Sequence, residues 1–300
     1  MDNTSKVHKL MELAELARLP RRKEVEGAVI VIKVGGHAMV DPAARSSIIK
    51  DIVTLRELGA LPVIVHGGGP EIDAMVKRMG MTPSFVAGIR VTDDETLEIV
   101  RMVLVGNVSP DIVSLIMRHG GKGVGLLGSS GSLLIARKKP MEKVKVDGKE
   151  IMVDYGWVGD TEQVNTSILM DLLDKGYIPV ISPIGYDRDG HCLNLNADTV
   201  AGDIASALKA GSLVSLTDVN GVMMDPSDKS TLLSHLTEKE CEDLIERGII
   251  SRGMIPKIRS SLCVLKAGAH SVHIINGNIE HALLLELLTE KGVGTRLTLK

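Results

Sequence analysis

The stretch that decides the fold is residues 28–36, AVIVIKVGG, followed by residues 61–70, LPVIVHGGGP. Each is a short, almost wholly apolar run that ends in glycines, which is typical of a strand buried on both faces of a parallel sheet. Glycines at the carboxyl end of such strands let backbone N–H groups approach an anion closely, and that edge is where open α/β sheets bind ligands. Lys33 adds a cation two residues before the first glycines. The two turns therefore predict a phosphate-binding site.

Strand patterns and helical patterns alternate from residue 27 to the C-terminus. Strands are expected at 28–34, 61–65, 124–127, 132–137, 143–146, 150–153, 177–181, 212–217 and 271–275, and helices from Asp41-Pro42 and at 70–78, 94–105, 110–119, 165–175, 197–210, 254–267 and 280–290. The alternation predicts an α/β fold, a three-layer αβα sandwich around a mostly parallel open sheet with two lobes. The hairpin region near 130–160 is expected to be an antiparallel insertion.

Composition excludes several classes of protein. The 300 residues are 44% hydrophobic and 24% charged with a net charge of −3, so no general affinity for nucleic acid or anionic membranes is implied. The three cysteines lack any CxxC spacing, which argues against a disulfide framework and against a cysteine metal site. No run of about 18 apolar residues and no leader pattern is present. We therefore expect a cytoplasmic protein.

The N-terminal residues 1–26 form a helical extension outside the predicted sheet. Residues 5–19 read as an amphipathic helix, because Leu10, Leu13, Ala14 and Ala17 recur on one face. An isolated helix of this length is marginal in water, so it requires a partner surface.

Four polar residues each allow a structural and a functional interpretation. Arg90 is either a surface ion-pair residue or a planar fork that clamps a substrate carboxylate. Asp198 is either a helix cap or a site residue. Lys257 lies in the first turn of a predicted helix, where a cation is disfavoured unless an anionic ligand or solvent compensates it. His66, beside the glycines, is better interpreted as a structural histidine that hydrogen-bonds the loop than as a catalytic base.

Five segments together carry a specific resemblance: KVGG (33–36), HGGGP (66–70), GIRVTD (88–93), NLNAD (194–198) and GMIPK (253–257). The combination resembles the amino acid kinase family from about residue 27 to the C-terminus. Within that family it is similar to the enzymes that phosphorylate N-acetyl-L-glutamate in arginine synthesis. GIRVTD is the segment that best separates this branch from carbamate, aspartate, glutamate and uridylate kinases.

The resemblance implies a role for each matching residue near the transferred phosphate. Lys33 and Lys257 would stabilise the γ-phosphoryl group of ATP, and Asp198 would lie between them and fix their positions. Gly35 and Gly36 would belong to the phosphate-binding turn, with Gly36 supplying a backbone donor.

The same resemblance implies the remaining binding sites. Gly68 and Gly69 would donate to the acetylglutamate, while Arg90 and Asn194 would hold its other carboxylate and its amide region. The TDVNGV segment, with Thr217, Asp218 and Gly221, resembles the adenine and ribose site. Residues 27–205 would then form the amino-acid-binding lobe, which also makes the dimer contact, and residues 206–300 the nucleotide lobe.

The implied reaction agrees with the residues present. A glutamate side-chain carboxylate has a pKa of about 4.3 and is ionised at neutral pH, so it needs no general base. The reaction instead needs two anions aligned, with cations to offset their repulsion. Two lysines, backbone donors and Mg²⁺ bound with ATP would provide this.

Two rival functions stay open at this point. One is a kinase for aminoadipate or glutamate attached to an acidic carrier protein, although no cluster of positive charge is evident near Arg90. The other is an amino-acid-binding regulator without catalysis, although both lysines and Asp198 are present.

The N-terminal extension resembles that of the arginine-inhibited members of the family. There it links dimers into a hexameric ring, a trimer of dimers, and helps to form the arginine site. The resemblance therefore implies L-arginine as a feedback inhibitor and a homo-oligomer. The alternative is a helix docked on its own subunit.

Overall fold

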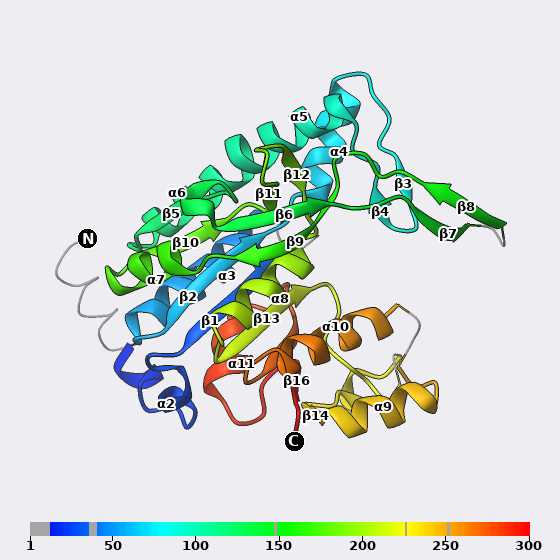
Figure 1. Ribbon diagram of the computed structural model, residues 1–300. Coiled ribbons are helices and arrows are strands. Elements are labelled where there is room, and N and C mark those ends of the chain that lie inside the picture. Colours follow the sequence, from blue (N-terminus) through cyan, green and yellow to red (C-terminus); the bar gives the residue numbers. More distant parts are fainter. Residues whose placement is uncertain (1–12, 36–40, 147–148, 226, 251–252) are drawn as a thin grey trace.

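The centre of the molecule is one eight-stranded sheet (Figure 1), seen in a computed structural model that describes residues 13–35, 41–146, 149–225, 227–250 and 253–300. Its strand order is β14-β16-β15-β13-β1-β2-β10-β5. The six strands from β15 to β5 run parallel to one another, whereas β16 pairs antiparallel with β15. The bounds are β14 (His235–Thr237), β16 (Thr295–Thr298), β15 (Val272–Asn276), β13 (Ser212–Thr217), β1 (Val29–Val34), β2 (Leu61–His66), β10 (Ile178–Ile181) and β5 (Gly123–Leu126).

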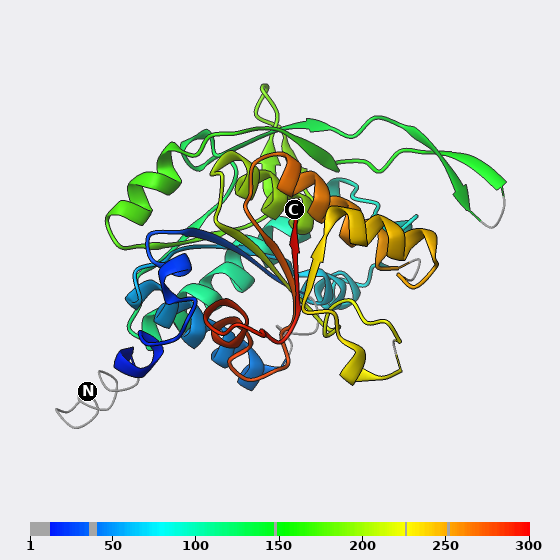
Figure 2. The ribbon, with the colours of Figure 1, turned by 90° about the horizontal axis from the view of Figure 1, so that it is seen from below.

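Helices cover both faces of this sheet, as Figure 2 shows from below. One face buries apolar residues of α2 (Arg22–Val25), α3 (Pro42–Glu57), α4 (Gly69–Arg78), α5 (Asp94–Val103), α6 (Ser109–Arg118) and α11 (Ala282–Leu288). The other face buries those of α7 (Ser167–Asp174), α8 (Ala197–Ala207), α9 (Glu238–Glu246) and α10 (Ile255–Lys266). The expected three-layer αβα sandwich is confirmed.

The alternation of side chains along β1 decides which face receives Lys33. Ile30, Ile32 and Val34 pack into the core on the α3 side, whereas Val31 packs into the core on the α8 side. Successive side chains of a strand point to opposite faces, so Lys33 lies on the same face as Val31. The helix that covers this end of β1 is α8, which supplies the lysine's partner.

A smaller sheet, in which one of the three pairings is parallel, contains the antiparallel strands that are expected near 130–160. It consists of β12 (Cys192–Asn194), β11 (Ile184–Tyr186), β6 (Leu134–Lys138) and β9 (Gly159–Val164). Two hairpins accompany it, β3 (Phe85–Val86) with β4 (Ile89–Arg90) and β7 (Glu142–Val146) with β8 (Lys149–Val153), and the second projects from the body of the molecule (Figure 1). The expected Asp147-Gly148 turn lies outside the described residues.

The two helices expected at 94–105 and 110–119 form one helical run instead of two separate elements. A π-helical stretch, Leu104–Val108, joins α5 to α6 without a break. By length and composition this run, Asp94–Arg118, could cross a membrane, but half of its most apolar 18-residue stretch is buried inside the protein. A buried core helix passes the same test, and here Ile112 and Ile116 are fully buried.

The N-terminal segment is bonded to the last helix, α11. Most of the expected helix at 5–19 falls on residues 1–12, outside the described ones, and residues 13–16 are helical. The backbone N–H of Arg21 then donates to the carbonyl of Leu288 at 3.3 Å, which ties the N-terminal segment to α11.

Because β1 pairs directly with β13, the parts before and after residue 205 share one sheet. The division into two lobes stays a prediction.

Candidate active site

The turns after β1 and β2 lie against each other at the carboxyl edge of the sheet. The N–H of Gly67 donates to the carbonyl of Val34 at 2.8 Å, which joins the two glycine turns. A Cβ on Gly35 would lie 3.1 Å from the Nζ of Lys33, so a larger residue there would press on the ammonium group. The predicted phosphate turn is therefore built around Lys33. Gly36 lies outside the described residues.

Lys33 forms an ion pair with Asp198. Its Nζ lies 3.1 Å from Oδ1 of Asp198, and the lysine side chain is 14% exposed while that of the aspartate is 53% exposed. The alternative interpretation of Asp198 as the helix cap is wrong, because Asn196 accepts from the N–H groups of Asp198 and Thr199 at 2.9 and 3.0 Å. The carboxylate of Asp198 thus stays available for the lysine.

Lys257 lies in the first turn of α10, as the sequence predicts, and its side chain is exposed. In the part of the chain that the structure describes, it forms no ion pair with Asp198, which is paired with Lys33. The helix α10 packs on α8, and a Cβ on Gly202 would lie 2.7 Å from Val264. The convergence of Lys257 with Lys33 on one phosphate stays a prediction.

The predicted substrate donors Gly68 and Gly69 form the N-terminal end of α4. Gly68 is the N-cap, and a Cβ there would lie 2.5 Å from Cδ2 of Leu104, so a larger residue would force the buried Leu104 side chain to shift. A Cβ on Gly69 would meet nothing within 4 Å. The first N–H groups of a helix have no partner within it and carry a partial positive charge, so this end can bind a carboxylate.

Arg90 is held beside the same helix end and is only 8% exposed, which argues against the surface interpretation. Its Nη2 lies 2.7 Å from Oδ1 of Asp73 and donates to the carbonyl of Gly69 at 3.4 Å. The guanidinium also lies over the ring of Phe85, 4.5 Å from its centre. Asp73 and Phe85 are residues that the sequence reasoning missed.

The structure brings Asn194 and Arg90 together through Thr92. The side-chain amide of Asn194 donates to the hydroxyl of Thr92 at 3.2 Å, and that hydroxyl donates to the carbonyl of Arg90 at 3.3 Å. Trp157 adds a second tie, since its carbonyl accepts from the N–H of Asn194 at 2.9 Å. Thr92 belongs to the GIRVTD segment, so its motif was the available signal.

On the nucleotide side, Thr217 ends β13 and Asp218 is exposed just beyond it. The hydroxyl of Thr217 accepts from the N–H of Val219 at 3.2 Å and so shapes the loop. Gly221 has φ +133° and lies so close to Thr295 that a Cβ would be 2.5 Å from its hydroxyl. These residues form one loop at the same edge of the sheet, and their contact with a nucleotide stays a prediction.

One group of possible metal ligands occurs among the described residues, Asp187, Asp189 and His191. Asp187 accepts from the N–H groups of both other residues and from Nδ1 of His191 at 2.9 Å. Hydrogen bonds within the turn therefore account for this arrangement of side chains without a metal ion.

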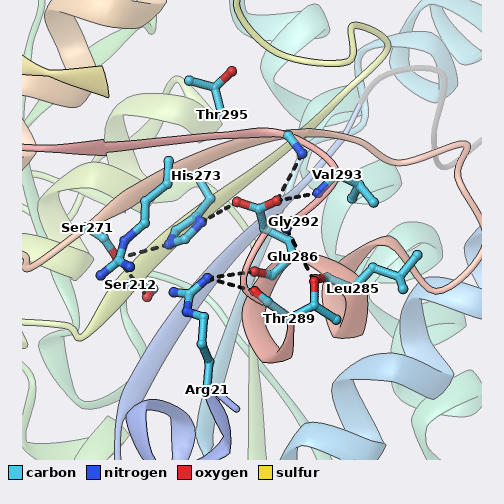
Figure 3. A network of polar contacts seen from close by, with 12 residues as sticks. Arg21, Ser212, Ser271, His273, Leu285, Glu286, Thr289, Gly292, Val293 and Thr295 are labelled. Atoms are coloured by element: carbon cyan, nitrogen blue, oxygen red, sulfur yellow. Dashed lines mark hydrogen bonds and ion pairs between the residues drawn. The ribbon is translucent and has the colours of Figure 1, made fainter. Parts of the chain in front are cut away.

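A cavity of about 530 Å³ lies between the N-terminal segment and the last strands. It is lined by Pro20, Arg21, Glu24, Ser234, His235, Glu286, Glu290, Lys291, Gly292 and Arg296. Figure 3 shows the network behind it. Nδ1 of His273 donates to Oε1 of Glu286 at 2.7 Å, and Oε2 accepts from the N–H groups of Val293 and Gly294.

The charges of this buried pair follow from its partners. Burial lowers the pKa of His273 more than the neighbouring carboxylate raises it. Burial acts to raise the pKa of Glu286, but the hydrogen bonds from His273 and two backbone N–H groups outweigh it and lower that pKa. The pair therefore consists of a neutral imidazole and a carboxylate. The carboxylate of Glu286 is thus a buried negative charge beside the cavity, whose lining also carries the cations Arg21, Lys291 and Arg296.

His66 is fully buried and bonds the loop, as predicted. Its Nδ1 donates to the carbonyl of Gly67 at 2.8 Å, and its Nε2 lies 2.9 Å from the hydroxyl of Ser182. Burial lowers the pKa of His66 to about 4, so the ring is neutral at pH 7. A neutral histidine with a hydrogen-bond partner at each ring nitrogen holds the glycine turn in place.

Replacing His66 with glutamine tests this assignment. The imidazole of His66 binds a proton near pH 6.5 in the unfolded chain but only near pH 4 in the folded chain. The protein therefore has its full unfolding free energy above pH 6.5 and loses part of it as the pH falls from 6.5 towards 4. Between pH 7 and pH 5 the wild-type protein should lose about 2 kcal/mol more unfolding free energy than H66Q, measured by urea unfolding. Parallel pH dependences in the two proteins would contradict the assignment.

The amino acid kinase family model matches residues 28–276. Acetylglutamate kinase of Methanococcoides burtonii is 55% identical over 277 residues, 92% of this chain and 91% of the relative. The enzyme of that name from Methanocaldococcus jannaschii is 52% identical over 292 residues, 96% of this chain and 97% of the relative.

Solved structures give the same answer for the fold. N-acetylglutamate synthase from Neisseria gonorrhoeae, complexed with coenzyme A and N-acetyl-glutamate, is 27% identical with a TM-score of 0.78. It matches 97% of this chain, which spans only 63% of the synthase. Carbamate kinase of Giardia, at 15% identity and a TM-score of 0.65 over 91% of this chain and 99% of the kinase, shares the fold. Matched over most of its length, this chain belongs to the amino acid kinase family.

Proposed function

We propose that this protein transfers the γ-phosphoryl group of ATP to the side-chain carboxylate of N-acetyl-L-glutamate. The products are N-acetylglutamyl 5-phosphate and ADP, a step in arginine biosynthesis. The observation that carries the proposal is the identity of 52–55% with relatives named acetylglutamate kinase over more than 90% of both chains. A cytoplasmic location goes with the proposal, because the reaction consumes ATP.

The phosphate end of the site is assigned to Lys33, Lys257 and Asp198. Two unit charges of like sign 4 Å apart repel by about 4 kcal/mol at an effective dielectric constant of 20, so an anion attacking a phosphate requires cations. Lys33 is positioned for this by its ion pair with Asp198. Lys257, exposed and unpaired among the described residues, keeps its charge free for a ligand.

The substrate end is assigned to the start of α4 and to the Thr92-linked pair. Gly68 and Gly69 offer N–H groups to the reacting carboxylate. Arg90 and Asn194 hold the other carboxylate and the amide region, which fixes the distance between the two carboxylates of the substrate. Recognition at two ends selects N-acetylglutamate by its length.

The nucleotide is assigned to the turn after β1 and the loop after β13. Gly35 and Gly36 would approach the phosphates, while Thr217, Asp218 and Gly221 would shape the nucleoside site. Mg²⁺ enters with ATP, because this ion binds mainly phosphate oxygens and water and uses few protein ligands. When bound it neutralises phosphate charge, and no protein ligand set is assigned to it.

Replacing Lys257 with alanine tests the proposal. Loss of a donor that acts on the transition state should lower kcat about 100- to 1000-fold, measured as ADP release with free N-acetyl-L-glutamate. Lys239→Ala, which removes an exposed lysine from α9, is the matched control and should keep wild-type turnover. Near-normal turnover of K257A would refute the role of Lys257.

The same assay separates the rival functions. A kinase for carrier-bound aminoadipate or glutamate would be slow with free N-acetyl-L-glutamate and fast with the carrier-bound substrate. A non-catalytic regulator would release no ADP with either.

We further propose that L-arginine inhibits the enzyme by binding in the cavity beside the N-terminal segment. Support comes from the synthase of Neisseria gonorrhoeae, 26% identical, which was solved with coenzyme A and L-arginine. Support also comes from the lining, because the carboxylate of Glu290 is exposed and has no ion-pair partner among the described residues, so it can receive a guanidinium or ammonium group. The other two lining glutamates are already engaged, Glu24 by Arg21 and Arg296 and Glu286 by His273 and two backbone N–H groups. In this proposal the N-terminal helix both completes the cavity and links dimers into a hexamer.

Deletion of residues 1–24 should remove both properties. The variant is expected to form dimers and to lose inhibition by arginine while it retains kinase activity, because Lys33 and Arg90 are untouched. Light scattering measures the mass, and ADP release with and without arginine measures inhibition. An unchanged hexamer, or a full-length protein that arginine does not inhibit, would reject the proposal.

A further inference from the structure

Asp73 is a charged residue of the substrate site that no motif accounts for. It lies on α4, four residues and therefore about one helical turn after Gly69. We propose that Asp73 is a positioning residue: its charge holds the guanidinium of Arg90 against α4 so that Arg90 receives the carboxylate next to the acetamido carbon of the substrate. The inference rests on the proposed function and deepens it.

The contacts of one guanidinium nitrogen carry the first step. Nη2 of Arg90 donates to the carbonyl of Gly69 at 3.4 Å and has Oδ1 of Asp73 at 2.7 Å. Oδ1 accepts no aligned hydrogen bond, so Asp73 acts on Arg90 as a counter-charge. Both contacts come from the first turns of α4. The helix that presents Gly68 and Gly69 therefore also fixes one edge of the arginine.

The other guanidinium nitrogen carries the second step. Nη1 of Arg90 is buried and has no hydrogen-bond partner among the described residues. A buried donor without an acceptor is unfavourable. An anionic oxygen that reaches Nη1 would supply the missing hydrogen bond and would also be attracted by the positive charge of the guanidinium. The half-exposed ring of Phe85 covers the face of the guanidinium and leaves its edge, with Nη1, uncovered by that ring. A ligand carboxylate is the group that matches Nη1.

The burial of Arg90 decides between this role and an ordinary ion pair. Exposed pairs contribute little because solvent screens them, but Arg90 is only 8% exposed while Asp73 is 34% exposed on its side chain. A mostly buried guanidinium that loses its counter-charge takes up solvated arrangements in place of the fixed one. The substrate must then pay for ordering it again, so its affinity falls while the reacting carboxylate is unaffected.

The experiment compares wild type, D73A and the isosteric D73N with two substrates. With N-acetyl-L-glutamate, both variants should raise KM about 10-fold or more, the scale for one charged hydrogen bond. Their kcat should stay within about threefold and the KM for ATP should not change. With 4-acetamidobutanoate, which lacks the carboxylate beside the acetamido group, the variants should match wild type in kcat/KM. D243A is the matched control, because Asp243 of α9 forms an exposed ion pair with Arg247 just beyond the end of that helix.

The outcomes separate the two claims. A wild-type protein that does not phosphorylate N-acetyl-L-glutamate overturns the proposed function and this inference together. Active wild type with an unchanged or lowered KM in both variants overturns the positioning role alone, and a lowered KM would mean that Asp73 competes with the substrate. An equal loss with both substrates would mean that Asp73 acts only on folding.

Discussion

The ion pair between Lys33 and Asp198 is the interaction on which the rest of the site depends. It forms because β1 alternates: its apolar residues fill both cores, and the lysine takes the position nearest the end of the strand on the α8 side. A side chain that is only 14% exposed needs a counter-charge, and α8 supplies it one residue inside its first turn. Asn196 caps that helix, which leaves the carboxylate of Asp198 free for the lysine.

The residues proposed to bind the substrate are likewise positioned by a few elements of the fold. The start of α4 supplies N–H groups at Gly68 and Gly69, and one turn later Asp73 faces Arg90. Thr92 links the arginine to Asn194, although 102 residues separate Thr92 from Asn194 in the chain. The start of α4 and the Thr92 link are thus held by elements that also belong to the core. Such a rigid frame is what an alignment-driven phosphoryl transfer requires.

Long apolar patterns and capping signals made most of the fold predictable from sequence. The strands expected at 28–34 and 61–65 and the helix start at Asp41-Pro42 all appear in the structure. Short strands such as β11, β12 and β14 were not predicted, because two or three residues carry no period and pair only in the folded protein. The helical break expected near residue 106 was replaced by a π-helical stretch that packing maintains.

Motifs marked the residues that are assigned to the proposed site, whereas the residues that contact them are visible only in the fold. Lys33, Arg90 and Asn194 stand in recognisable segments. Asp73 has the appearance of any helix-surface residue, and only the ion pair with buried Arg90 gives it a role. The pairing of His273 with Glu286 was equally invisible, because it depends on β15 and α11 meeting in the folded chain.

The central claim is that Lys33 and Lys257 act on one phosphate group. The most direct measurement is a crystal structure of the protein with a non-hydrolysable ATP analogue and N-acetyl-L-glutamate. The account predicts both Nζ atoms at charge-assisted hydrogen-bond distance, about 2.7–2.9 Å, from oxygens of the γ-phosphoryl group. A structure in which the two lysines face different cavities would contradict it.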